Sequence, residues 1–60
     1  MESAGILYGT VYARINLAQF YHENGDDNRA KSHGVKALGT SKDLNIQDGI
    51  MQSSKILIEI

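Results

Sequence analysis

The sequence predicts an all-α protein in which an antiparallel helical hairpin is followed by a third helix. Apolar residues recur every three or four positions over about residues 3–24, 27–41 and 46–60, which is the spacing of one face of a helix. None of these segments alternates apolar and polar residues as a half-buried strand does. Gly25 separates the first two segments, and glycine readily takes the left-handed conformation that ends a helix. We therefore expect a single small helical domain over residues 1–60.

The first predicted helix carries two adjacent apolar stripes. One stripe consists of Ile6, Thr10, Ala13, Leu17 and Phe20, and the other consists of Leu7, Val11, Ala18 and Tyr21. Together they form a wide apolar face, which is expected of a helix with neighbours on two sides. Tyr8, Tyr12 and Ile15 lie outside both stripes. The hydroxyl of Ser3 can accept an unpaired backbone N–H at the start of this helix.

The segment His22–Asn28 is the predicted turn into the second helix. Asp26 or Asp27 can cap that helix, where a negative charge also suits the positive end of the helix dipole. The inner face of the second helix consists of Ala30, Gly34, Ala37 and Leu38. The small residues Ala30, Gly34 and Ala37, together with Ala18 of the first helix, predict a close helix crossing. A glycine inside a helix costs roughly 1 kcal/mol relative to alanine, so Gly34 predicts a very close neighbour.

A short connection, Ser41–Leu44, is expected before the third helix. Asn45 and Asp48 stand at the spacing of a capping box, with a shorter acid than usual. The predicted apolar face of the third helix consists of Ile46, Ile50, Ser53 or Ser54, Leu57 and Ile60, widened by Met51 and Ile58. At an offset of 40 residues this helix weakly repeats the first, with Ile6 aligned to Ile46, Gly9 to Gly49, Val11 to Met51 and Leu17 to Leu57. The offset predicts the start of a second, similar unit.

Charge and hydropathy limit the classes of function. The formal net charge is −1 and the six basic residues are spread along the chain, so no nucleic-acid surface is expected. The apolar runs are far shorter than the ~20 residues that span a bilayer. No basic region precedes the first apolar residues, so we expect no signal peptide and a cytoplasmic location.

The small size of the chain predicts a need for additional contacts. A chain of about 60 residues buries only ~60% of its unfolded surface. The sequence contains no cysteine, which excludes disulfides and cysteine-based zinc sites. We therefore expect a homo-oligomer, neighbouring repeats or a bound partner to contribute stability.

Seven spaced positions in the first two predicted helices and the turn between them hold Leu17–Ala18, Tyr21, Gly25, Ala30, Gly34 and Ala37. Their spacing, which covers about half of the chain, resembles a tetratricopeptide repeat, and six of the seven residues fit that family. The sequence departs from the family at Gly34, where a bulky ring is usual, at Arg14, where Trp is frequent, and at Lys42, where Pro is frequent. The resemblance implies a helical hairpin plus the first helix of the next repeat, an α-solenoid fragment. The longer repeat offset is loosely similar to repeats of bacterial regulatory and sensor proteins.

The same resemblance implies a binding groove on the inner side of the first helix. The corresponding positions are Tyr12, Ile15, Asn16, Gln19, His22 and Glu23. An amide such as that of Asn16 can donate and accept hydrogen bonds together, which suits a peptide backbone. Tyr12 offers a large surface with a polar tip. The alternative is that Tyr12 and Ile15 pack on a neighbouring repeat or on a second copy of the chain.

The residues favour no catalytic, metal or cofactor site. His22 and His33 are the only histidines, and the simpler interpretation is that both are solvated or lie at helix ends. The segment Asp43–Gly49 lacks the glycine and glutamate positions of a calcium loop, and Gly34–Ser41 lacks the lysine of a phosphate loop. Ser32 is adjacent to His33 in a predicted helix, where neighbours point in different directions. We therefore expect that the protein is not an enzyme.

The function implied by the resemblance is non-catalytic binding of a protein or peptide partner, as in regulation or signalling. The main alternative is a self-associating structural protein that buries Tyr8, Tyr12 and its C-terminal Ile and Leu residues against copies of itself. A more distant alternative is a small DNA-binding helix-turn-helix protein. Its recognition helix would be Asp27–Ser41, but the acidic residues at the start of that helix oppose phosphate contact.

Overall fold

The computed structural model describes the backbone of residues 3–60 and the side chains from residue 5 onward. These residues form three helices and no strand, α1 (Ser3–Glu23), α2 (Asp27–Leu44) and α3 (Gln47–Glu59), which confirms the predicted all-α class. The expected cap at Ser3 concerns a side chain outside the described ones. Among the helices of residues 3–60, none combines the length and the apolar character needed to cross a membrane.

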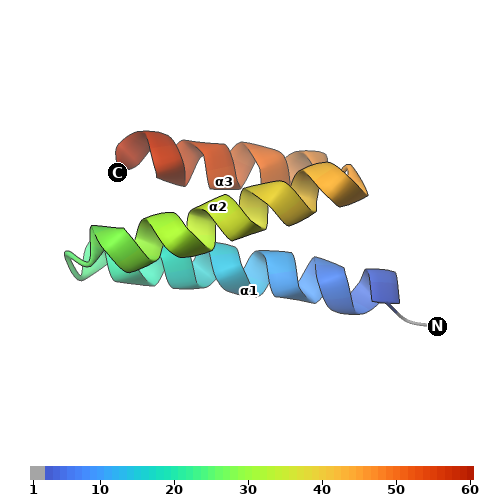
Figure 1. Ribbon diagram of the computed structural model, residues 1–60, viewed down its shortest axis with the longest axis horizontal. Coiled ribbons are helices and arrows are strands. Elements are labelled where there is room, and N and C mark those ends of the chain that lie inside the picture. Colours follow the sequence, from blue (N-terminus) through green and yellow to red (C-terminus); the bar gives the residue numbers. More distant parts are fainter. Residues whose placement is uncertain (1–2) are drawn as a thin grey trace.

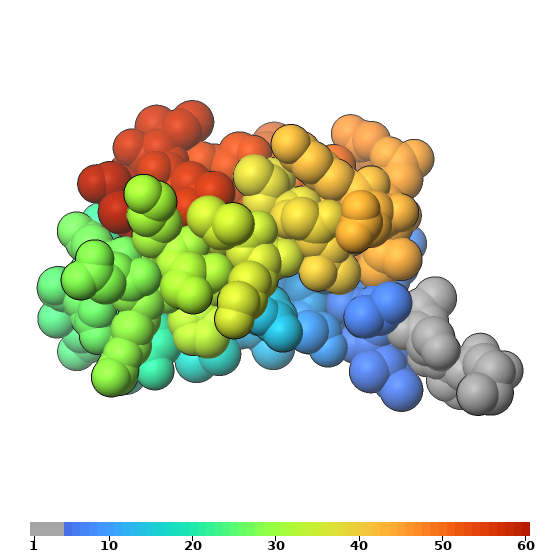
Figure 2. Space-filling view, viewed as in Figure 1, coloured from blue at the N-terminus to red at the C-terminus, as the bar shows by residue number. Residues whose placement is uncertain are grey.

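The middle helix, α2, organises the other two. The chain reverses twice, so α2 is antiparallel to α1 and α3, which run in the same direction (Figure 1). The contact of α2 with α1 is more extensive than its contact with α3, and α1 and α3 touch over a shorter stretch. In the space-filling view, α2 lies across the boundary between α1 and α3 (Figure 2). Both outer helices therefore have one side covered by α2.

The same left-handed motif ends α1 and α2. Gly25 has a φ of 81°, and the Asp26 N–H donates to the Tyr21 carbonyl at 2.8 Å. At the end of α2, Asn45 has a φ of 57°, and the Ile46 N–H donates to the Ser41 carbonyl at 2.8 Å. Each motif satisfies carbonyl groups that the helix end would otherwise leave unpaired. Glycine and asparagine suit these positions because both tolerate the left-handed region.

The predicted connection Ser41–Leu44 is wrong, because α2 continues to Leu44. The chain contains no proline to stop the helix earlier, so α2 runs until Asn45 reverses the backbone. The capping box at Asn45 and Asp48 is also not formed. Asn45 is the C-cap of α2, whereas the N-cap of α3 is Ile46, which makes no side-chain capping bond.

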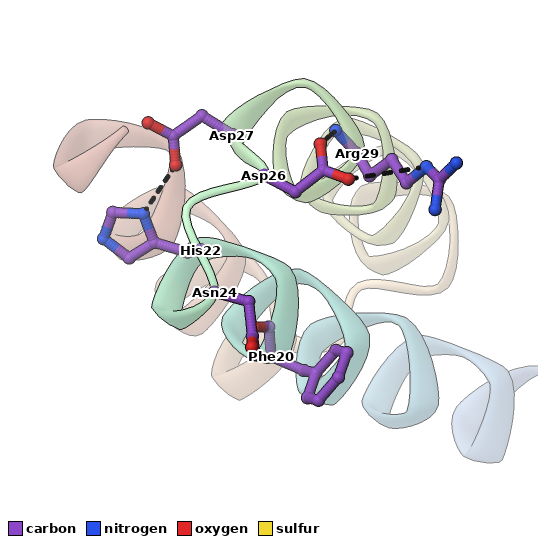
Figure 3. Close-up of polar contacts among 6 residues, drawn as sticks. All are labelled: Phe20, His22, Asn24, Asp26, Asp27 and Arg29. Atoms are coloured by element: carbon purple, nitrogen blue, oxygen red, sulfur yellow. Dashed lines mark hydrogen bonds and ion pairs between the residues drawn. The ribbon is translucent and has the colours of Figure 1, made fainter.

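The predicted cap of α2 is present at Asp26. Its Oδ1 accepts the Arg29 backbone N–H at 3.2 Å, and its Oδ2 lies 3.5 Å from the Arg29 Nε (Figure 3). Asp27 follows in the first turn, where its negative charge interacts favourably with the positive end of the helix dipole. The turn between α1 and α2 is thus fixed by local polar contacts.

Small residues occupy the helix crossings. Ala18, Ala30, Gly34 and Ala37 are all buried, as the sequence predicts. A Cβ atom added to Gly34 would lie 3.0 Å from the Leu57 Cδ2, so a side chain of α3 fills the space that glycine leaves. Among the side chains from residue 5 onward, the large aliphatic ones in the core are Val11, Ile15, Ile46 and Ile56. The core therefore contains few large side chains, and the helices pack closely because small residues separate them.

The predicted inward face of α1 is partly right. Val11 and Ala18 of the second predicted stripe are buried, together with Ile15, which was in neither stripe. Ile6, Leu17 and Phe20 of the first stripe are exposed. Apolar residues are spread around the whole of α1, so spacing alone does not select the inward face.

The predicted inward face of α3 is also partly right. Ile46 at the N-cap and Ser53 are buried as predicted, and Gly49 and Ile56 are buried beside them. Met51 and Ile58 are exposed. The sequence offset of 40 residues is therefore not a structural equivalence. Gly9 is exposed while Gly49 is buried, and Val11 is buried while Met51 is exposed. The alignment pairs residues on different faces of the two helices.

Candidate functional site

The six residues predicted to form a groove all lie on α1, but they do not share one surface. Asn16, Gln19 and Glu23 are exposed, and Tyr12 and His22 are half-buried. Ile15 is only 2% exposed and packs in the core with Val11, Ile46 and Ile56. This burial removes Ile15 from any surface that a partner can reach, and the cluster around it includes residues of all three helices of the same chain.

A shallow groove of about 300 Å³ lies between α1 and α3. Of the predicted residues, only Gln19 lines it; the other lining residues are Gln52, Lys55, Ile56 and Glu59 of α3. These four residues follow the i, i+3, i+4, i+7 spacing of a helix, so they share a side of α3. The spacing of these residues can be read from the sequence. The packing of that side beside Gln19 of α1 depends on the tertiary arrangement.

The chemistry of the groove suits binding of an extended chain. The Gln19 amide can donate and accept a hydrogen bond, which matches the paired N–H and C=O groups of a peptide. The Gln52 Nε2 already donates to the Asp48 Oδ2, and the Gln52 amide keeps its oxygen and a second N–H for a ligand. Lys55 and Glu59 add one charge of each sign, and Ile56, which is 7% exposed, supplies an apolar floor. A site lined in this way can hold and orient a ligand, with the charged side chains setting its polarity.

Tyr12 forms a hydrogen bond between α1 and α3. Its hydroxyl donates to the Asp48 Oδ2 at 3.0 Å, and the Gln52 Nε2 donates to the same oxygen at 2.7 Å. The hydrogen bond to the Asp48 carboxylate, with smaller contributions from burial and from nearby negative charge, raises the pKa of Tyr12 above its ordinary value. The Tyr12 hydroxyl, which was predicted to face a bound partner, therefore contacts α3 of the same chain.

We expect Tyr12→Phe to lower the urea midpoint of unfolding at neutral pH, because the bond to Asp48 is lost. A raised pKa in the folded state means that this stabilisation is fully present below about pH 10, the value of an unfolded tyrosine. It is lost as the pH rises through the pKa of folded Tyr12. Urea titrations of both proteins across this range should therefore converge at high pH. A difference that stays constant with pH would exclude the hydrogen bond as its source.

The polar residues at the α1–α2 turn are mostly engaged with one another. The His22 Nδ1 lies 3.0 Å from the Asp27 Oδ1 (Figure 3). Tyr21 stacks on His33 with ring centroids 5.5 Å apart, and the Arg29 guanidinium lies 5.7 Å from the Tyr21 ring centroid. The alternative DNA-recognition helix carries three basic residues, Arg29, Lys31 and Lys36, and of these Arg29 already contacts Asp26 and the Tyr21 ring.

The described residues contain no group of three or more His, Asp or Glu side chains placed to hold a metal ion. His22 and His33 instead take part in the separate contacts of the turn. Comparison of the chain with protein-family models, with curated proteins and with solved structures finds no match. The resemblance to tetratricopeptide repeats therefore stays a prediction from the sequence.

Proposed function

We propose that this chain is a non-catalytic interaction module that binds a peptide segment of a partner protein in the groove between α1 and α3. The observation that carries the proposal is the lining of this groove. Two amides, one cation, one anion and an apolar floor face a shallow, open site. This set can satisfy a peptide backbone while contacting its side chains. Regulation or signalling through the partner, in the cytoplasm, belongs to the same proposal.

A panel of random peptides displayed on phage provides the first test. Peptides selected on the wild-type chain are expected to bind at least about tenfold more weakly to the double variant Gln19→Ala, Gln52→Ala. Each lost hydrogen bond is worth about 1 kcal/mol, and 1.4 kcal/mol corresponds to a tenfold change in affinity. Fluorescence anisotropy with the selected peptides measures the change.

The matched control is Lys36→Ala, because Lys36 is exposed on α2 and does not line the groove. It should change the affinity less than twofold. If no peptide is enriched, or if the selected peptides bind the double variant and the wild type equally well, the groove is not a peptide site.

A structural role through self-association is the second proposed function. It is supported by the exposed large apolar side chains, which are more numerous than the large ones in the core. The exposed set consists of Ile6, Leu7, Tyr8, Leu17, Phe20, Val35, Met51 and Ile58. Monomeric proteins rarely leave extended apolar patches uncovered, so part of this surface is suited to a protein contact.

A further inference from the structure

We propose that the turn between α1 and α2 is a site of spontaneous covalent modification. Asn24 loses its side-chain amide as ammonia through a cyclic imide formed with the backbone nitrogen of Gly25. Water is the co-reactant, and the products are aspartate and isoaspartate at position 24. The inference depends neither on peptide binding in the groove nor on self-association.

The sequence favours this reaction at one position. Ring closure requires the backbone nitrogen of the next residue to reach the carbonyl carbon of the asparagine side chain, and a side chain on that next residue hinders the approach. The residues that follow the four asparagines of the chain are Leu17, Gly25, Arg29 and Ile46. Asn24 is therefore the one asparagine that precedes a glycine, the residue with no Cβ atom and the widest range of backbone angles.

The reaction balances with water alone. The Gly25 nitrogen gives up its proton and attacks the Asn24 Cγ. The N–Cγ bond forms, the Cγ–Nδ2 bond breaks, and Nδ2 leaves with that proton as ammonia. Water then opens the five-membered imide. Cleavage of the N–Cγ bond gives aspartate, whereas cleavage of the bond to the main-chain carbonyl carbon gives isoaspartate, in which the backbone runs through Cγ.

In the closed turn, hydrogen bonds engage both reacting groups. The Asn24 Nδ2 donates to the Phe20 carbonyl at 2.8 Å, within the last turn of α1 (Figure 3). The Gly25 N–H donates to the His22 carbonyl at 3.1 Å. Both bonds must break before the ring can close. Asn24 and Gly25 are exposed and directly follow Glu23, the last residue of α1, and such helix ends open at a small fraction of the free energy of global unfolding. Local opening of the turn therefore sets the rate.

A second pair in the chain provides a contrast. Asp48 also precedes a glycine, and an aspartate can form the same imide by loss of water. Here, however, both residues lie in the first turn of α3, and Gly49 is buried. The Asp48 carboxylate accepts hydrogen bonds from the Tyr12 hydroxyl and the Gln52 Nε2. Ring closure at Asp48 would require α3 to unwind, so this pair should not react while the protein is folded.

The products weaken the turn that forms them. A carboxylate cannot donate a hydrogen bond to the Phe20 carbonyl as the Asn24 amide does. It changes the formal net charge from −1 to −2 and places the new negative charge at the C-terminal end of α1, the negative end of the helix dipole. Isoaspartate also adds one carbon atom to the backbone, which displaces the N–H groups of Gly25 and Asp26 from the carbonyls that they reach in the left-handed motif. The modified hairpin should therefore unfold at a lower urea concentration.

Peptide mapping by mass spectrometry tests the site. Folded wild-type protein is incubated at mildly alkaline pH, and the peptide containing Asn24 should gain the mass of an amide-to-acid exchange, with fragmentation identifying both aspartate and isoaspartate. Asn45, which ends α2 in the same left-handed motif but precedes Ile46, should stay unmodified, as should Asp48. The matched control is Asn24→Gln, which keeps the amide but would have to form a six-membered ring, and it should not react.

Two comparisons test the control of the rate by local opening. Asp26→Ala removes the bond that fixes the turn to the Arg29 N–H, so it should accelerate the reaction about fivefold. Asp43→Ala, the same change at an exposed acid near the other end of α2, should alter the rate less than twofold. Urea below the unfolding transition should hardly change the wild-type rate, because local opening exposes little surface. Complete unfolding should raise it about tenfold or more, because both protecting hydrogen bonds are lost.

Four results would overturn the proposal. Folded protein that gains no mass at Asn24 has no modification site there. A product without isoaspartate would mean direct hydrolysis without the imide. A rate that rises with low urea in step with global unfolding would assign the reaction to the unfolded chain. An aged sample with the same urea midpoint as fresh protein would show that the turn tolerates the product. Failure here leaves the groove untouched, since the peptide-binding measurements use fresh protein and different residues.

Discussion

Replacing Gly49 with alanine is expected to destabilise the protein by about 1–3 kcal/mol, although alanine is the better helix former. A Cβ atom at this position would lie 3.1 Å from the Val11 Cγ1 and 3.2 Å from the Ser41 Cβ, and it would collide with the Ser41 Oγ. The three residues belong to three different helices, so relief at one contact disturbs another. A domain of this size has roughly 3–5 kcal/mol of stability in total, so the loss should be large in relative terms.

Urea unfolding followed by circular dichroism measures this effect, with Gly39→Ala as the matched control. Gly39 lies in the interior of α2, and a Cβ atom there would meet no atom within 4 Å. Gly39→Ala should therefore stabilise the protein by up to about 1 kcal/mol through helix propensity alone. An equal gain in both variants would mean that α3 does not approach α1 and α2 closely at Gly49.

A second substitution identifies the contact that causes the loss. Ser41→Ala removes the oxygen nearest to the added methyl group, and the Ser41 Oγ is fully buried without a hydrogen-bond partner. In the Gly49→Ala background this change should recover part of the lost stability, and the two substitutions should show a positive coupling in a double-mutant cycle. Strict additivity would contradict the packing of Ser41 against Gly49.

Ile15→Ala is expected to reduce the free energy of unfolding by about 2–4 kcal/mol. Ile15 is 2% exposed and contacts the buried cluster that joins the three helices. Truncation to alanine removes buried apolar surface and leaves a cavity that a thin core of small residues cannot easily refill. Urea unfolding at a fixed protein concentration provides the measurement.

The matched control is Ile58→Ala, the same chemical change at a position that is 83% exposed in α3. Both substitutions also gain helix propensity, more at Ile15 in the interior of α1 than at Ile58 in the last turn of α3, so propensity works against the expected difference. Ile58→Ala should change the stability by no more than about 0.5 kcal/mol. If the two variants lost equal stability, α1 would not present the Val11–Ala18 line to the core.

Local features were predictable because they depend on residues close together in the chain. The all-α class follows from helical spacing, the reversal at Gly25 from glycine's access to the left-handed region, and the cap at Asp26 from its acceptor oxygen. Small residues at Ala30 and Ala37 also indicated a close crossing before any packing was known. The end of α2 was less predictable, since asparagine is favoured as the cap before a helix but also occurs in the left-handed position after one.

The inward faces of the helices were decided by tertiary packing. Two stripes on α1 satisfied the helical period equally well, and neither contained Ile15, which became a core residue. The choice depends on where α2 and α3 lie, which is a non-local property. For the same reason, Gln19 was identified as a surface residue from the sequence, but its neighbours in the groove were not.

The sequence by itself thus determined three helices, their order and the residues that allow them to approach closely. Only the tertiary structure determined that α3 rests beside α1, that Gly49 meets Val11 and Ser41, and that Ile6, Leu17 and Phe20 remain outside. The physical reason is that hydrogen bonding and helix capping are local, whereas burial is settled by the sum of contacts between segments distant in the chain.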